Sequence, residues 1–135
     1  MDTIRVAAGI LTDGCRILIT RRAPEENFAG KWEFPGGKIE NHETEQECLV
    51  RELKEELDID VVVGEFLTEV LHDYGSFKVK LKTYYCTITG GTISVSVHDK
   101  YKWVHANELL NYELLPADIP VVKQLMETTQ HSPRG

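Results

Sequence analysis

The sequence predicts an α+β protein that folds as one domain, and three observations support this. The chain has 135 residues, 41% of them hydrophobic, which is enough for one core and too few for two full domains. Strand-like β-branched runs are interspersed with segments of helical periodicity. No repeat or linker-like tract divides the sequence. We therefore expect one domain over residues 1–130 and a frayed tail at 131–135.

The N-terminal part predicts a hairpin followed by a loop. Residues 4–11 and 15–21 are strand-like, and Asp13-Gly14 between them is a hairpin signal. Residues 22–35 have no sustained period and predict a loop that leads into a short strand at 31–34. The Pro35-Gly36-Gly37 segment that follows predicts a sharp turn.

A helix is predicted over residues 44–57. Thr44 and Glu47 form a capping box at its start. The apolar residues recur at helical spacing: Leu49, Val50, Leu53 and Leu57.

The C-terminal half predicts mainly strands. We expect them over residues 61–70, 77–89, 92–97 and 101–104, with a turn at Gly90-Gly91. A short helix is predicted over 107–110 and a terminal helix over 119–128, where Pro120 is tolerated in the first turn.

Charge and cysteine content narrow the possible functions. The chain has 15 basic and 22 acidic residues, a net charge of −7, which argues against a nucleic-acid polymer as partner. Its three cysteines lack metal-ligand spacing, which is typical of a reduced compartment, and we expect each of them to be an inert core or half-buried residue. No signal peptide and no apolar run of about 18 residues is found, so we expect a cytoplasmic protein without membrane association.

The predicted helix concentrates negative charge on one face. Glu52, Glu55 and Glu56 stand at i, i+3 and i+4, where like charges oppose helix formation by about 0.2–0.5 kcal/mol per pair. A divalent cation would relieve this repulsion, and oxygen ligands favour Mg²⁺ or Mn²⁺. Gly36 and Gly37 would let the backbone approach the same ion or its phosphate. Three glutamates alone more often form a solvated helix face, so the interpretation depends on the joint spacing.

That spacing resembles the Nudix box, Gly-x5-Glu-x7-Arg-Glu-U-x-Glu-Glu-x-Gly-U, where U is bulky and aliphatic. The matching residues are Gly37, Glu43, Arg51, Glu52, Leu53, Glu55, Glu56 and Ile59. Asp58 replaces the glycine that ends the helix, and Asp is one of the residues that tolerate positive φ. We expect a modest loss of stability there and an intact site.

The resemblance extends over nearly the whole chain and indicates the MutT-like branch of the family. The segments 20–23, 32–40 and 116–121 resemble that branch in the same order. The resemblance implies a Nudix fold, an α/β/α sandwich around a mixed β-sheet. It also implies hydrolysis of a nucleoside triphosphate to the monophosphate and pyrophosphate with Mg²⁺ or Mn²⁺, by a monomer or small homo-oligomer.

The resemblance assigns roles to individual residues. The implied catalytic residues are Glu52 as general base, Glu43 as supporting base or outer metal ligand, and Arg51, which would orient the glutamates. The implied metal ligands are the Gly36 carbonyl, Glu52, Glu55, Glu56 and Asp99. The implied substrate-binding residues are Arg22, Phe34, Lys38 and Asp118.

The Asp99 assignment comes from strand alternation. The family often supplies another acid shortly before the tryptophan equivalent to Trp103, and Val97 occupies that position here. Asp99 lies two residues on and would face the same side of a strand. We expect His98 between them to be a surface residue.

Asp118 is the residue expected to read the base. An ionised Asp only accepts hydrogen bonds, which suits an exocyclic amine. Its segment resembles branch members that prefer cytosine nucleotides, whereas MutT proteins that clear oxidised guanine carry Asn there. The sequence predicts sanitising of nucleotides such as 8-oxo-dGTP, with CTP, dCTP or 5-methyl-dCTP as the alternative. A catalytically silent nucleotide-binding module is the alternative from another class.

Overall fold

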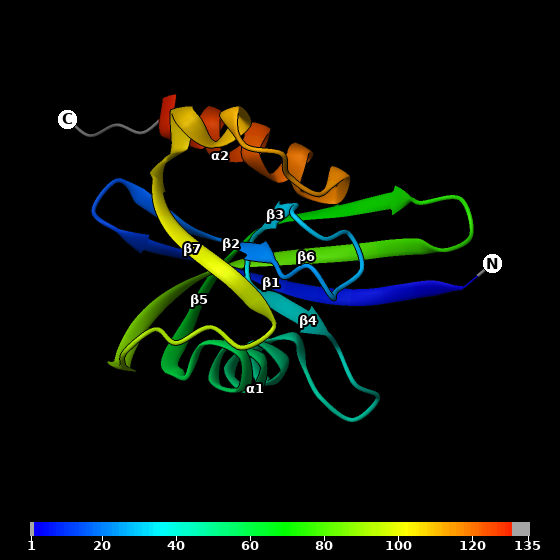
Figure 1. Ribbon diagram of the computed structural model, residues 1–135, viewed down its shortest axis with the longest axis horizontal. Helices are drawn as coiled ribbons and strands as arrows, with labels where there is room; N and C mark the ends of the chain where they lie inside the picture. The colour runs from blue at the N-terminus through cyan, green and yellow to red at the C-terminus, as the bar shows by residue number, and fades with distance from the viewer. Residues whose placement is uncertain (1, 131–135) are drawn as a thin grey trace.

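The computed structural model describes residues 2–130, in which a helix covers each side of a mixed sheet (Figure 1). The sheet order is β3-β2-β1-β6-β5, with β4 paired to β1 and β7 paired to β2. The strands are β1 Thr3–Asp13, β2 Arg16–Arg22, β3 Trp32–Glu33, β4 Gly36–Lys38, β5 Ile59–Asp73, β6 Lys78–Gly91 and β7 His98–His105. The helices are α1 Glu45–Leu57, α2 Ile119–Gln130 and the short 3-10 helices η1 Ala106–Asn111 and η2 Pro116–Asp118. The predicted tail at 131–135 lies outside the described residues.

Strand β1 organises the sheet. It runs parallel to β6 along its length and is antiparallel to both β2 and β4. Its pairing with β2 is confined to the hairpin, which leaves the same edge of β1 free to pair with β4 at Gly36–Lys38. A Cβ atom at Gly36 would overlap the Ala7 carbonyl oxygen, so glycine is needed for this close pairing. The sequence predicted only a turn here, and this was incomplete.

Helix α1 matches its prediction closely. The capping box forms, with the Glu47 amide donating to Thr44 Oγ1 at 3.1 Å and the Thr44 amide donating to Glu47 Oε1 at 2.9 Å. Asp58 ends the helix in the left-handed conformation, with φ 58°. The predicted helix and its unusual C-cap are therefore both confirmed.

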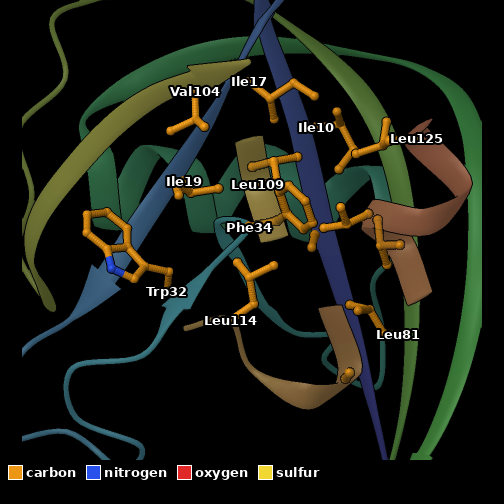
Figure 2. Packing of buried hydrophobic residues seen from close by; sticks show 14 residues of the cluster. Ile10, Ile17, Ile19, Trp32, Phe34, Leu81, Val104, Leu109, Leu114 and Leu125 are labelled. Carbon is orange, nitrogen blue, oxygen red and sulfur yellow. The ribbon is translucent and has the colours of Figure 1, made fainter. Parts of the chain in front are cut away.

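Two hydrophobic clusters lie on opposite faces of the sheet. The leucines of α1 pack on one face, against residues that include Leu11, Ile59 and Tyr84. The other cluster includes Ile10, Ile19, Phe34, Leu81, Leu109 and Leu125, and Figure 2 shows the strand side chains meeting Leu125 of α2. The α/β/α sandwich around a mixed sheet is confirmed.

Residues 92–97 do not form the predicted strand. Strand β6 continues through Gly90 and Gly91, which pair with β5, so the predicted turn there is wrong. The following segment crosses the end of α1, where the Ser94 amide donates to the Leu57 carbonyl at 2.9 Å. Helix ends leave carbonyl groups without intrahelical partners, and this segment satisfies one of them.

Two other expectations about single residues were wrong. Cys48 and Cys86 are buried as expected, but Cys15 is exposed, because it lies at the β1–β2 hairpin. His98 is buried rather than on the surface, because it faces inward from β7. Across residues 2–130, no helix combines the length and the apolar composition needed to span a membrane.

Candidate active site

A cleft of about 780 Å³ opens between β4, α1, the β5–β6 turn and η2, the 3-10 helix directly before α2. One end is polar and includes Arg22, Glu33, Gly36, Gly37, Glu52 and Glu56. The other end is largely apolar and includes Phe34, Tyr74, Phe77, Leu115, Ala117 and Asp118. A charged group and an apolar ring system could therefore bind side by side.

Helix α1 places Glu52 directly on the backbone of β4. A Cβ atom at Gly37 would overlap the Glu52 carboxyl group, so only glycine allows this approach. The Glu52 side chain is 13% exposed and accepts from Arg51 Nη1 at 2.8 Å. The carboxylate is thus held at the cleft wall in one orientation.

Arg51 holds three glutamates together. Its Nε and Nη2 donate to the two Glu43 oxygens at 2.9 and 2.6 Å, and Nη1 donates to Glu52 and, at 3.3 Å, to Glu55. Its Nη2 also donates to the Lys38 carbonyl at 3.2 Å. A bidentate pair of this kind is strong and geometrically specific. The predicted orienting role of Arg51 agrees with this geometry.

Glu43 lies behind the site rather than in it. It does not line the cleft, and the hydrogen bonds from Arg51, followed by one from the Glu40 backbone, lower the pKa of Glu43 to about 2. A carboxylate with so low a pKa is a weak base at neutral pH. This arrangement favours Glu52 over Glu43 as the proton acceptor.

Glu56 lies one turn after Glu52 and lines the cleft. Burial raises the pKa of Glu56 to about 9, and its hydrogen bond with Glu52 and the Glu52 charge act in the same direction. With no cation at the site, the Glu56 carboxyl therefore keeps its proton at neutral pH. The crowding of Glu52 and Glu56 is the electrostatic problem that the sequence predicted.

The residues present fit a hard divalent cation. Glu52, Glu56 and the Gly36 carbonyl are all oxygen donors at the polar end of the cleft. Glu55 points to Arg51 instead, with its side chain 61% exposed. Within residues 2–130, no three His, Cys, Asp or Glu side chains are already grouped as ligands. Glu55 would have to leave Arg51 to join the other two.

Arg22 and Glu33 lie next to the carboxylates. A β-bulge at Asp99 of β7, opposite Arg21 and Arg22 of β2, sets Arg22 opposite His98, and Arg22 Nη1 donates to Glu33 Oε2 at 3.0 Å. Bulges often re-aim side chains beside active sites. The sequence interpretation gave Glu33 no role. Strand alternation could have indicated one, because Glu33 lies between Trp32 and Phe34 and faces the opposite side of the short strand from these two apolar residues.

The apolar end of the cleft contains Phe34 and Asp118. Phe34 is 3% exposed, so it belongs both to the core and to the cleft wall. Tyr74 accepts the Ala117 amide at 3.2 Å and stacks with Phe77, at 5.3 Å between ring centroids. These aromatic residues were not selected from the sequence, because the β5–β6 turn is distant along the chain.

The surroundings of Asp118 oppose the ionised form that the sequence predicted. Asp118 is 4% exposed, and burial raises its pKa well above the usual value. The charge of Glu33 acts in the same direction, while a hydrogen bond from the Phe34 backbone opposes it. A protonated carboxyl offers one donor as well as acceptors.

Two other predicted site residues lie at or beyond the edge of the cleft. Lys38 is exposed on the cleft rim. Asp99 does not line the cleft and accepts from Arg21 Nε and Nη2 at 2.9 and 2.7 Å. The alternation argument does not apply because β7 begins at His98, after Val97. The predicted residues therefore line the cleft except Arg51, Glu43, Glu55 and Asp99.

Comparison with known proteins identifies the family of this chain. Residues 6–124 match the family model described as NUDIX domain. The chain is 36% identical to CTP pyrophosphohydrolase of Escherichia coli (strain K12), covering 93% of each chain. It is 35% identical to a putative 8-oxo-dGTP diphosphatase 2 of Mycobacterium tuberculosis (strain CDC 1551 / Oshkosh), covering 94% of this chain and 91% of that one.

A solved structure is similar to this chain over the whole length of this chain. The solution structure of the E. coli ORF135 protein has a TM-score of 0.86 and 34% sequence identity, covering 100% of this chain and 96% of that one. The family match includes the carboxylate helix and all residues of the cleft except Ile4. This chain therefore belongs to the Nudix family, among its MutT-like hydrolases of phosphoric anhydrides.

Proposed function

We propose that this protein is a nucleoside triphosphate pyrophosphohydrolase that uses Mg²⁺ or Mn²⁺ to remove oxidised or modified nucleotides. The observation that carries the proposal is the two-ended cleft, with oxygen ligands at one end and an aromatic wall with Asp118 at the other. A nucleotide has the same two parts, a polyphosphate and a flat base. The products would be the nucleoside monophosphate and pyrophosphate.

Glu52, Glu56 and the Gly36 carbonyl are the groups we assign to the cation, with Glu55 joining them. When bound, a divalent cation neutralises the polyphosphate and lowers the pKa of a bound water. Glu52 is the base that accepts the proton of the attacking water, since Arg51 orients its carboxylate and Gly37 lets it reach the cleft.

The remaining polar residues bind and position the substrate. Arg22 and Lys38 line the polar end and supply positive charge for phosphate oxygens. Glu43 acts through Arg51, because both of its oxygens accept from that guanidinium. We assign Asp99 no step, since Arg21 occupies its carboxylate.

The base is chosen at Asp118. A protonated Asp118 beside Glu33 combines a donor with acceptors, so both a guanine and a cytosine edge find partners there. Relatives are named for 8-oxo-dGTP and for CTP, which supports the same two candidates. A silent binding module is disfavoured because Glu43, Arg51, Glu52, Glu55 and Glu56 are all present. The reduced compartment expected from the free cysteines supports a cytoplasmic site of action.

A substrate panel tests the proposal. Purified protein is incubated with 8-oxo-dGTP, dGTP, CTP, dCTP and 5-methyl-dCTP, with and without Mg²⁺ or Mn²⁺, and products are identified by ³¹P NMR. We expect metal-dependent release of pyrophosphate. Release of orthophosphate at a steady rate would contradict the reaction, and nucleotide binding without turnover would favour the silent module.

Glu52→Gln tests the catalytic assignment. Loss of the general base should lower kcat by about 10² to 10⁴. Glu127→Gln, which changes an exposed residue of α2, is the matched control and should leave kcat unchanged. Near-normal turnover of Glu52→Gln at saturating Mg²⁺ would overturn the role of Glu52.

A further inference from the structure

His98 is buried at the junction of three strands. Its side chain is 1% exposed, and it pairs with Arg22 across the β2–β7 ladder, at the bulge. Within residues 2–130, one buried side-chain nitrogen or oxygen has no hydrogen-bond partner, and this atom is His98 Nδ1. An unpaired polar atom inside a protein lowers its stability, and an apolar side chain could fill the same space without this loss. Packing alone therefore does not account for a histidine at this position.

The other ring nitrogen makes one short contact. His98 Nε2 lies 2.8 Å from Glu33 Oε2, the oxygen that also accepts from Arg22 Nη1 at 3.0 Å. A carboxylate paired with a guanidinium accepts hydrogen bonds and has none to donate, so the hydrogen is assigned to Nε2. Two donors on β2 and β7 thus hold one oxygen of a side chain on β3.

Glu33 lies between the two ends of the cleft. It lines the cleft, and its charge acts on both Glu56 and Asp118. Because His98 and Arg22 both use Oε2, Oε1 is left for a ligand, and no described residue donates to it. An anionic oxygen near the base end can accept a hydrogen bond from an amino group.

We propose that His98 is a positioning residue which holds Glu33 so that its Oε1 accepts a hydrogen bond from the exocyclic amino group of the substrate base. This inference rests on the proposed function and names the chemical feature that the site selects. His98 does not touch the nucleotide. Arg22 neutralises Glu33, while His98 sets the direction of its carboxylate.

Two substitutions separate positioning from packing. His98→Leu removes the donor and keeps an apolar side chain, whereas His98→Gln keeps an amide N–H that can reach Glu33. Val104→Ala is the matched control, because Val104 is also buried on β7 but lies six residues, or about 20 Å, from His98. Melting temperatures of all three variants measure the purely structural effect.

The assay compares nucleotides that differ in the amino group. We measure kcat and KM for dCTP against dUTP and for dGTP against dITP. For the pair that contains the preferred base, kcat/KM of the wild type should be at least tenfold higher for the substrate that carries the amino group than for the substrate that lacks it. This ratio corresponds to about 1.4 kcal/mol. His98→Leu should lose most of this ratio through KM, His98→Gln should restore it to within about threefold, and Val104→Ala should keep it.

Several results would overturn the inference while leaving the proposed function intact. They are a wild-type ratio near one, an unchanged ratio in His98→Leu, or a ratio in His98→Gln as low as in His98→Leu. Calorimetric binding of CMP against UMP, and of GMP against IMP, applies the same test without turnover or metal. If wild-type protein hydrolyses no triphosphate, the proposed function fails, and these binding ratios still decide the role of His98.

Long-range ¹H–¹⁵N NMR of the imidazole provides a spectroscopic readout. We expect His98 as the Nε2–H tautomer, with a shift that changes in Glu33→Gln and not in Val104→Ala. A His98 ring that carries its hydrogen on Nδ1 alone would contradict the proposed contact.

Discussion

Replacing Glu56 by Gln should stabilise the metal-free protein at alkaline pH. Glu56 has its pKa raised from 4.5 to about 9, because it is half-buried and lies against Glu52. The folded state therefore keeps a proton that the unfolded state releases. Stability contributed by this proton is complete below pH 4.5 and is lost as the pH rises toward 9. A glutamine resembles the protonated carboxyl and has no proton to lose.

The size of the effect follows from the pKa difference. Each pH unit between the two pKa values changes the free energy of unfolding by at most about 1.36 kcal/mol per proton. From pH 5 to pH 8 the upper value is about 4 kcal/mol. Because Glu56 is only partly buried and solvent screens its charge, we expect about 2 to 4 kcal/mol.

Urea unfolding in EDTA at pH 5, 6.5 and 8 measures this difference. The stability of wild-type protein should fall relative to Glu56→Gln as the pH rises, while Glu127→Gln should follow the wild type. Added Mg²⁺ should then stabilise the wild type more at pH 8 than at pH 6.5, since the cation replaces the proton. It should stabilise Glu56→Gln less than it stabilises the wild type. Parallel wild-type and Glu56→Gln profiles, within about 0.5 kcal/mol, would refute the reasoning.

Two further substitutions test single features of the structure. Asp118→Asn should keep most of the substrate ranking, because a protonated carboxyl and an amide both donate and accept hydrogen bonds. The kcat/KM values for the substrate panel measure this, and a reordered ranking in Asp118→Asn would contradict it. Asp58→Gly should stabilise the protein by about 1 kcal/mol and raise Tm by about 2 to 4 °C, because glycine adopts φ 58° without strain. Calorimetry measures this change, and an unchanged or lower Tm would show that Asp58 is not strained.

Local features of the fold could be predicted from the sequence. The helix over 44–57 and its capping box depend on residues three and four positions apart, so spacing alone identifies them. The same holds for the left-handed Asp58, which follows the last turn directly. The predicted strand at 92–97 failed because its neighbours are the end of α1 and not another strand.

The family resemblance was also sufficient to select the helix carboxylates, Arg51 and the two glycines as candidates for the site. It could not show which of them face the cleft. Glu43 and Glu55 match the box as well as Glu52 does, yet Arg51 draws both toward itself. Side-chain partners decide this, and they come from more than one element.

The sequence by itself therefore determined the fold family, the carboxylate helix and the class of chemistry, because these depend on local spacing along one segment. Only the tertiary structure decided the neighbours of Glu33, which are Arg22 from β2 and His98 from β7, 11 and 65 residues away in sequence. It also decided that the pKa of Asp118 is raised, since burial and the nearby Glu33 charge depend on how distant segments pack. Long-range contacts of this kind leave no periodic signal in a single sequence.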